Sequence, residues 1–150
     1  MADGTAPTAQ QAFASLMRAR IAPALRALGF KGSGQTYELP HLETWALIGF
    51  QKAARQTAGQ VEFTLNVTVA DKLGWAQARR REPHLPARPS PNTVYGPAAA
   101  WHSRIGRLLP ADRDTWWTIT ATTDPEPVAR GVISAVTEYA LPAIRERRRS

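Results

Sequence analysis

Polar and apolar residues alternate without interruption between Val61 and Val69, where the sequence reads V-E-F-T-L-N-V-T-V. Strict alternation predicts a β-strand with one face in a core and the other face turned elsewhere. The polar face of this strand, with Asn66 at its middle, is therefore the first place to look for a function.

Two longer segments repeat their apolar residues at the spacing of an amphipathic helix. The first follows the capping residue Thr8 and extends to about Leu28, and the second follows the helix-start sequence Thr123-Asp124-Pro125. Pro23 and Pro142 lie inside these segments in the similar stretches Ile-Ala-Pro-Ala-Leu and Ala-Leu-Pro-Ala-Ile. A proline inside a helix predicts a kink or a break, so the similarity is either coincidence or two similar kinks.

Further strands are predicted on both sides of the alternating segment. Gln35–Leu39 and Thr44–Lys52 precede it, and the three together predict an antiparallel meander. A short helix is predicted at Lys72–Arg81, and the prolines that follow it exclude regular structure. Two further strands, at Trp101–Leu109 and Thr115–Ala121, are predicted to form a hairpin. This order predicts an α+β fold, with an antiparallel sheet of about five strands and the N- and C-terminal helices packed on one face.

The length of 150 residues suits one domain with a single core. We expect that domain at residues 8–145, with a proline-rich loop at 82–100, a flexible tail at 1–7 and a basic tail at 146–150 that makes few packed contacts. The sequence contains no membrane-spanning run and no signal-peptide pattern, which predicts a cytoplasmic protein. Without cysteine, disulfides, thiolate metal sites and cysteine nucleophiles are excluded.

The formal net charge of +7 is concentrated in two arginine clusters, one near the end of the predicted short helix and one at the C-terminus. Two interpretations stay open: solvated arginines at helix ends, or a patch that binds the phosphates of a nucleic acid. The candidate phosphate contacts are Arg79, Arg80, Arg81, Arg147, Arg148 and Arg149.

Motifs for catalysis are weak. The glycine-rich stretch Gly29–Gly34 leads from a helix into a strand, the reverse of a phosphate-binding loop, and so predicts a hairpin turn. His41, His84 and His102 lack metal-ligand spacing. We therefore expect no catalytic residue, no metal and no cofactor.

The second face of the predicted sheet carries an unusual mixture of residues. If Ala46, Ile48 and Phe50 join the core, their neighbours point to the far side, and one of Trp116 and Trp117 must also do so. Either the proline-rich loop packs over this face, or the face forms a groove for a ligand or a partner. The candidate residues are Trp45, Gln51, Asn66, Arg104 and Trp116.

Asparagine is disfavoured in strands, so Asn66 is expected to make hydrogen bonds that threonine or valine could not make. Its amide offers donors and an acceptor, and Gln51 on the neighbouring predicted strand offers the same groups. The pair either anchors the covering loop or binds a ligand.

Five short segments occur in a characteristic order: Leu28-Gly29-Phe30-Lys31, Phe50-Gln51-Lys52, Phe63-Thr64-Leu65-Asn66-Val67, Arg104-Ile105-Gly106 and Asp114-Thr115-Trp116-Trp117. Together they resemble bacterial domain-of-unknown-function family number 4304 across about residues 12–145. The resemblance implies a small stand-alone α+β domain. It implies no established reaction, ligand or catalytic residue.

The leading hypothesis is a non-catalytic binding or protein-interaction module that uses the second sheet face, with another protein or a small ligand as partner. The alternative is a nucleic-acid accessory protein that contacts phosphates through the two arginine clusters. A third class, a small hydrolase or transferase, would need a histidine within hydrogen-bonding distance of a carboxylate in a pocket.

Overall fold

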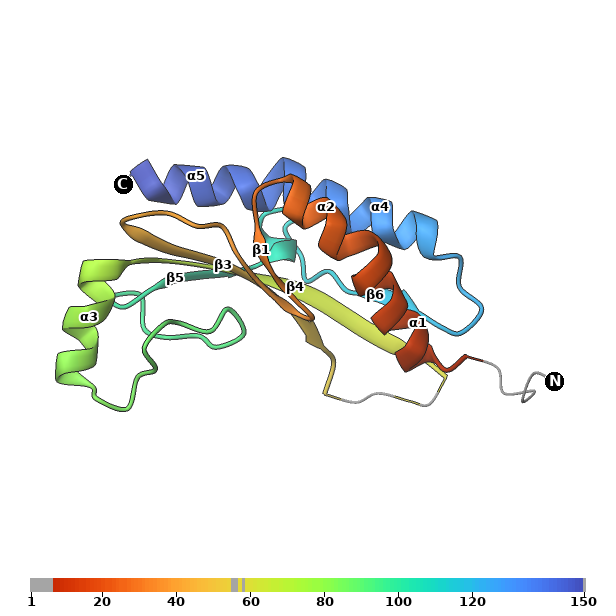
Figure 1. Ribbon diagram of the computed structural model, residues 1–150, viewed down its shortest axis with the longest axis horizontal. Coiled ribbons are helices and arrows are strands. Elements are labelled where there is room, and N and C mark those ends of the chain that lie inside the picture. Colours follow the sequence, from red (N-terminus) through yellow and green to blue (C-terminus); the bar gives the residue numbers. More distant parts are fainter. Residues whose placement is uncertain (1–6, 55–56, 58, 150) are drawn as a thin grey trace.

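The two amphipathic segments form a helical layer over one face of the sheet (Figure 1). The computed structural model describes residues 7–54, 57 and 59–149. The first segment consists of α1 (Ala9–Leu16), the π-helical turn η1 (Met17–Ile21) and α2 (Ala22–Ala27). The second consists of α4 (Pro125–Ala135), the π-helical turn η3 (Val136–Ala140) and α5 (Leu141–Arg149). Thr8 and Asp124 cap the two segments through their side chains, as predicted.

Each of the two prolines is preceded by a π-helical turn. The amide of Ala22 bonds to the carbonyl of Met17, and the amide of Leu141 bonds to the carbonyl of Val136. Proline has no N–H, and its ring clashes with a carbonyl of the preceding turn. The wider turn changes the hydrogen-bond register ahead of the proline, so the helix continues past it. Of the two interpretations of the similar stretches, the structure favours two similar distortions, and each distortion is a π turn.

The sheet is antiparallel throughout, and the α+β fold is confirmed. In the part of the chain that the structure describes, its six strands are β1 (Lys31–Ser33), β2 (Thr36–Glu38), β3 (Thr44–Lys52), β4 (Val61–Asp71), β5 (Trp101–Arg104) and β6 (Trp117–Ile119). Strands β2, β3 and β4 form the predicted meander. The glycine-rich stretch forms a hairpin, as predicted, and its first arm adds β1 to the edge of the sheet.

The predicted hairpin of the last two strands is wrong. Strand β5 pairs with the second half of β4, opposite Asn66 to Val69, and β6 pairs with the first half, opposite Val61 to Phe63. The two strands thus follow one another along the same edge of β4. Between them, the 3-10 turn η2 (Ile105–Arg107) and the segment that follows leave the sheet. A Cβ atom on Gly106 would lie 2.1 Å from the carbonyl oxygen of Arg113, so only glycine allows this close return of the chain.

The alternating residues of β4 point as predicted. Val61, Phe63, Leu65, Val67 and Val69 all join the core beneath the helices. Trp117 joins them, with its ring centroid 5.6 Å from that of Phe63, and Trp116 therefore points to the opposite side of the sheet.

The second face is covered by α3 (Lys72–Arg81) and by the proline-rich segment 82–100, which contains no helix or strand. A small apolar cluster joins this cover to the sheet. It includes Trp75 of α3, which is 1% exposed and donates a hydrogen bond to the carbonyl of Pro86 at 3.1 Å. Figure 1 shows α3 and this loop on the side of the sheet away from the other helices.

The C-terminal arginines belong to a helix as far as Arg149. The side chain of Arg148 donates hydrogen bonds to Thr44 Oγ1 at 3.0 Å and to the carbonyl of Leu39 at 2.6 Å. Burial lowers the pKa of the Arg148 guanidinium, and the neighbouring charge of Arg145 adds to this effect. Residues 1–6 and Ser150 of the expected tails lie outside the described residues. Among the helices of the described part, none combines the length and apolar character needed to cross a membrane.

Candidate functional site

Three polar side chains on the far face of β4 are buried. Thr64, Asn66 and Thr68 are at most 1% exposed. A buried polar group is costly unless it is hydrogen-bonded, so each needs a partner from a neighbouring segment. Thr64 Oγ1 donates to the carbonyl of Thr115 at 2.7 Å, and Thr68 Oγ1 lies 3.5 Å from the carbonyl of Pro91. Strand β4 therefore holds both segments that cross its far face.

Asn66 connects the sheet to the proline-rich loop. Its Nδ2 donates to Gln51 Oε1 at 2.7 Å and to Asn92 Oδ1 at 2.9 Å. Of the two alternatives for the pair of Gln51 and Asn66, these bonds favour the one in which it anchors the covering loop. Asn66 Oδ1 is buried, and no described residue donates a hydrogen bond to it. The amide anchors the loop and keeps one acceptor unused.

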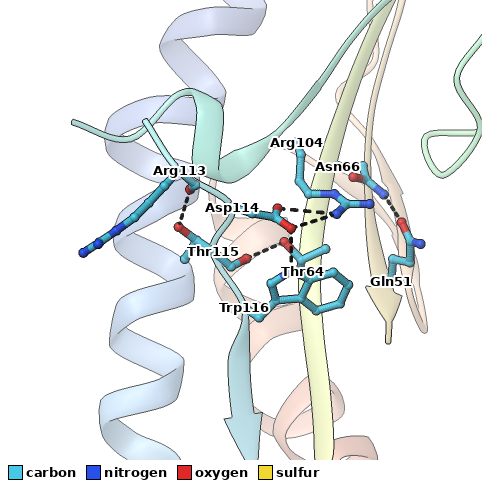
Figure 2. A network of polar contacts seen from close by, with 8 residues as sticks. All are labelled: Gln51, Thr64, Asn66, Arg104, Arg113, Asp114, Thr115 and Trp116. Atoms are coloured by element: carbon cyan, nitrogen blue, oxygen red, sulfur yellow. Dashed lines mark hydrogen bonds and ion pairs between the residues drawn. The ribbon is translucent and has the colours of Figure 1, made fainter. Parts of the chain in front are cut away.

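Beside Asn66, three side chains form the group that we call the Arg104 cluster: Arg104, Asp114 and Trp116 (Figure 2). Arg104 lies opposite Asn66 in the register of β4 and β5. Its NH1 is 3.2 Å from Asp114 Oδ2, and its guanidinium carbon is 5.2 Å from the ring centroid of Trp116. Trp116 Nε1 in turn donates to Asp114 Oδ2 at 2.8 Å. Each member of the cluster thus contacts the other two.

The Arg104 cluster is accessible to solvent. The side chains of Arg104 and Asp114 are 34% and 51% exposed. Because solvent screens such a pair, it adds little to the stability of the fold. A cavity of about 440 Å³ borders the cluster, lined by Val94, His102, Ser103, Arg104, Arg107 and Asp114.

The loop that carries Asp114 is held firmly. Gly106 packs against the backbone of Arg113 and Thr115, and Thr64 holds the carbonyl of Thr115. Arg107 NH1 donates to the carbonyl of Asp112 at 3.3 Å, and Asp112 adopts a left-handed φ of 46°. These contacts fix the direction from which Asp114 and Trp116 approach Arg104.

Of the five candidate residues on the second face, four lie together. Gln51 bonds to Asn66, Asn66 lies opposite Arg104, and the Arg104 guanidinium lies over the ring of Trp116 (Figure 2). Trp45 on β3 packs instead against the cover formed by α3 and the loop, and Lys72 Nζ and the Arg88 guanidinium lie 4.5 Å and 4.8 Å from its ring centroid.

Sequence reasoning missed two residues of this site. Asp114 was not among the candidate residues of the second face, yet its carboxylate pairs with Arg104, ten residues earlier. Its position two residues before Trp116 was the available signal. Asn92 lies in a segment without periodicity, where no pattern indicated a contact with β4.

The two arginine clusters lie at the same end of the molecule, but on opposite faces of the sheet (Figure 1). Arg79, Arg80 and Arg81 are all exposed, and Arg79 Nε donates to the carbonyl of Leu85. In the other cluster, Arg148 bonds to Thr44 and Leu39, and Arg147 lies 4.5 Å from the ring centroid of Trp101. The side chain of Arg149 is outside the described part.

The histidines that form hydrogen bonds do so with the backbone. His41 Nδ1 accepts from the amides of Glu43 and Thr44 at 3.1 Å and 3.2 Å. His102 Nε2 lies 3.2 Å from the carbonyl of Pro91. Burial lowers the pKa of His102; the bond to Pro91 opposes this, and the charge of Arg104 adds to it. In the described ranges, no three His, Asp or Glu residues are grouped so that they could hold a metal ion.

Comparison with known proteins identifies a family. The family model described as "Domain of unknown function (DUF4304)" matches residues 21–146. A search of curated proteins and a search of solved structures each found no match. Four of the five segments on which the resemblance rests meet at the site, and they supply Gln51, Thr64 with Asn66, Arg104, and Asp114 with Trp116.

Proposed function

We propose that this chain, which belongs to the DUF4304 family, is a non-catalytic protein-interaction module that binds a protein partner through the Arg104 cluster. The observation that carries the proposal is the stacked pair of Arg104 and Trp116, oriented by Asp114 and accessible to solvent.

The chemistry of the pair supports this role. Tryptophan and arginine are the residues most enriched among those that dominate binding free energy at protein interfaces. A guanidinium stacked on an indole ring and held by a carboxylate is already oriented, so less side-chain entropy is lost when a partner binds. The cavity beside Arg104 and Arg107 offers space for a side chain of the partner.

The rest of the second face is less available. Segment 86–92 covers its middle, where Leu47 and Thr68 are fully buried. The Trp45 end is occupied by Lys72 and Arg88. The Arg104 end is therefore the part of this face that a partner can reach.

The proposal is tested with a partner that the full-length protein captures and that is then purified. Arg104→Ala and Trp116→Ala should each weaken direct binding by about 30-fold or more, the effect of losing a dominant interface residue. Thermal melting checks that both variants remain folded.

Arg81→Ala serves as the matched control, because it removes an exposed arginine from the cluster on α3. It should leave binding unchanged. Binding that is insensitive to Arg104→Ala and Trp116→Ala in folded protein contradicts the proposal. Affinity for duplex or single-stranded nucleic acid that falls with Arg81→Ala and with rising salt would instead support the nucleic-acid alternative.

A further inference from the structure

A second cavity lies between the first helical segment and the hairpin of β1 and β2, on the helix side of the sheet. Its volume is about 250 Å³. The floor is apolar and includes Phe13, Met17 and Tyr37, which are 3%, 4% and 1% exposed. These side chains also belong to the main core, so the floor is held in place by packing.

The rim of this cavity is cationic. Arg18, Arg26 and Lys52 line it, and none of the described residues that line it is an aspartate or a glutamate. Lys52 Nζ donates to Gln10 Oε1 at 2.8 Å and lies 5.0 Å from the ring centroid of Phe13. An ammonium group has three donors, so donors remain for a further acceptor. Arg26 NH2 donates to the carbonyl of Gly32 at 3.0 Å.

Among the three cations of the rim, Arg18 has the most hydrogen-bond donors available for a ligand. Within the described ranges its side chain has no hydrogen-bond or ion-pair partner, whereas Arg20 on the same π turn pairs with Glu126. The π turn η1 contributes Met17 to the floor and Arg18 to the rim. Single π turns inside α-helices are frequent at functional sites. The π turn that precedes Pro23 therefore supplies two of the residues that line the cavity.

We propose that this cavity binds a small aryl carboxylate, with the ring against Phe13, Met17 and Tyr37 and the carboxylate held by Arg18 and Lys52. The size fits, since a cavity of about 150 Å³ accepts benzene and 250 Å³ leaves room for an anionic substituent. The charge fits as well, because guanidinium and ammonium groups form strong hydrogen bonds with carboxylates. This site is separate from the Arg104 cluster, so the inference does not depend on the proposed function.

Phenylacetate is the probe, titrated into the full-length protein and followed by calorimetry and by NMR shifts of residues around the cavity. We expect saturable binding at one site. Phenylacetamide, which has the same ring without the charge, should bind at least about tenfold more weakly, because charge-assisted hydrogen bonds are stronger than neutral ones. Inorganic phosphate at the same concentration should not compete with phenylacetate, since it has no apolar group to pack against the floor of the cavity.

Two variants locate the site. Arg18→Gln should weaken phenylacetate binding by at least about tenfold, and Ala14→Leu should block it by filling space at the lining. Arg145→Gln is the matched control, because it removes an equal charge from an exposed residue on α5 and should leave binding unchanged. The proposal is overturned if phenylacetate does not saturate, if phenylacetamide or phosphate binds equally well, or if Arg18→Gln binds like Arg145→Gln. Melting curves confirm that each variant is folded.

Discussion

At the scale of single residues, the polar side of β4 acts as an attachment surface for distant segments. Thr64 holds the loop that carries Asp114, Asn66 holds Asn92, and Thr68 lies against the carbonyl of Pro91. A buried polar group that loses its partner costs about 1–3 kcal/mol, so these side chains fix the loops in place. The functional candidates at the Arg104 cluster depend on this attachment.

Gly49 tests how closely the proline-rich loop packs on β3. A Cβ at this position would lie 2.5 Å from Asn92 Oδ1 and 2.7 Å from Pro91 Cγ, so the loop must move. Gly49→Ala should lower the free energy of unfolding by about 1–3 kcal/mol, the usual cost of overpacking. The measurement is urea denaturation.

The control for Gly49→Ala is Gly96→Ala in the same loop, where an added Cβ meets no atom within 4 Å. This variant should be neutral or slightly stabilising, because alanine restricts the unfolded chain. Equal stability of the two variants would mean that the loop does not press on β3.

His102 should make the stability depend on pH. Burial lowers its pKa below the ordinary value of 6.5, so the unfolded chain takes up a proton at a higher pH than the folded chain. The stabilising contribution is complete above 6.5 and is lost as the pH falls through the lower pKa of the folded state. Urea denaturation at several pH values should therefore show a shallower decline for His102→Gln than for the wild type. Parallel declines would contradict this expectation.

At the scale of elements, both long helical segments accommodate an internal proline with a π turn that precedes it. In each, the π turn ends two residues before the proline. The helices therefore stay continuous and keep their apolar stripes on the sheet. In the first, the turn also directs Arg18 and Arg20 toward different surroundings.

The last turn of α5 should contribute to stability. Arg148→Ala removes two hydrogen bonds, to Thr44 and Leu39, that join the helix to β3 and to the chain ahead of it. We expect the free energy of unfolding to fall by about 1–3 kcal/mol, since bonds that involve a charged group are stronger than neutral ones. Thermal or urea denaturation measures the change. Arg145→Ala, at an exposed position of the same helix, should change it by less than about 0.5 kcal/mol.

At the scale of the whole molecule, β4 lies at the centre of two layers. Its apolar side packs on the helices, and its polar side carries the loops and the cover formed with α3. Strand β3 pairs with one edge, and β5 and β6 share the other. A change in β4 should therefore affect the entire fold.

Leu65→Ala tests this central position. Leu65 is fully buried in the main core, and removing its side chain should cost about 2–5 kcal/mol through lost burial and a residual cavity. The matched control is Leu73→Ala, whose side chain is 67% exposed and whose loss should cost less than about 0.5 kcal/mol. A cost below about 1 kcal/mol for Leu65→Ala would contradict the assignment of the core face.

The sequence by itself determined which faces join the core between the helices and the sheet. The alternation of Val61 to Val69 and the helical spacing around Ile21 and Val132 are local patterns, and burial follows them because side-chain direction repeats with the backbone. The same rule placed Gln51 and Asn66 on one face of neighbouring strands, where the structure joins them by a hydrogen bond.

Only the tertiary structure decided what meets that face. The pairing of β5 and β6 with β4 depends on the return of the chain at Gly106, a contact between backbone segments that no periodicity encodes. Asn92 on Asn66, Asp114 on Arg104 and Arg148 on Thr44 likewise join residues separated by 26, 10 and 104 positions. Such contacts depend on how loops and helix ends pack in three dimensions. For this reason only the tertiary structure shows that the proline-rich loop covers most of the far face and leaves the Arg104 cluster accessible.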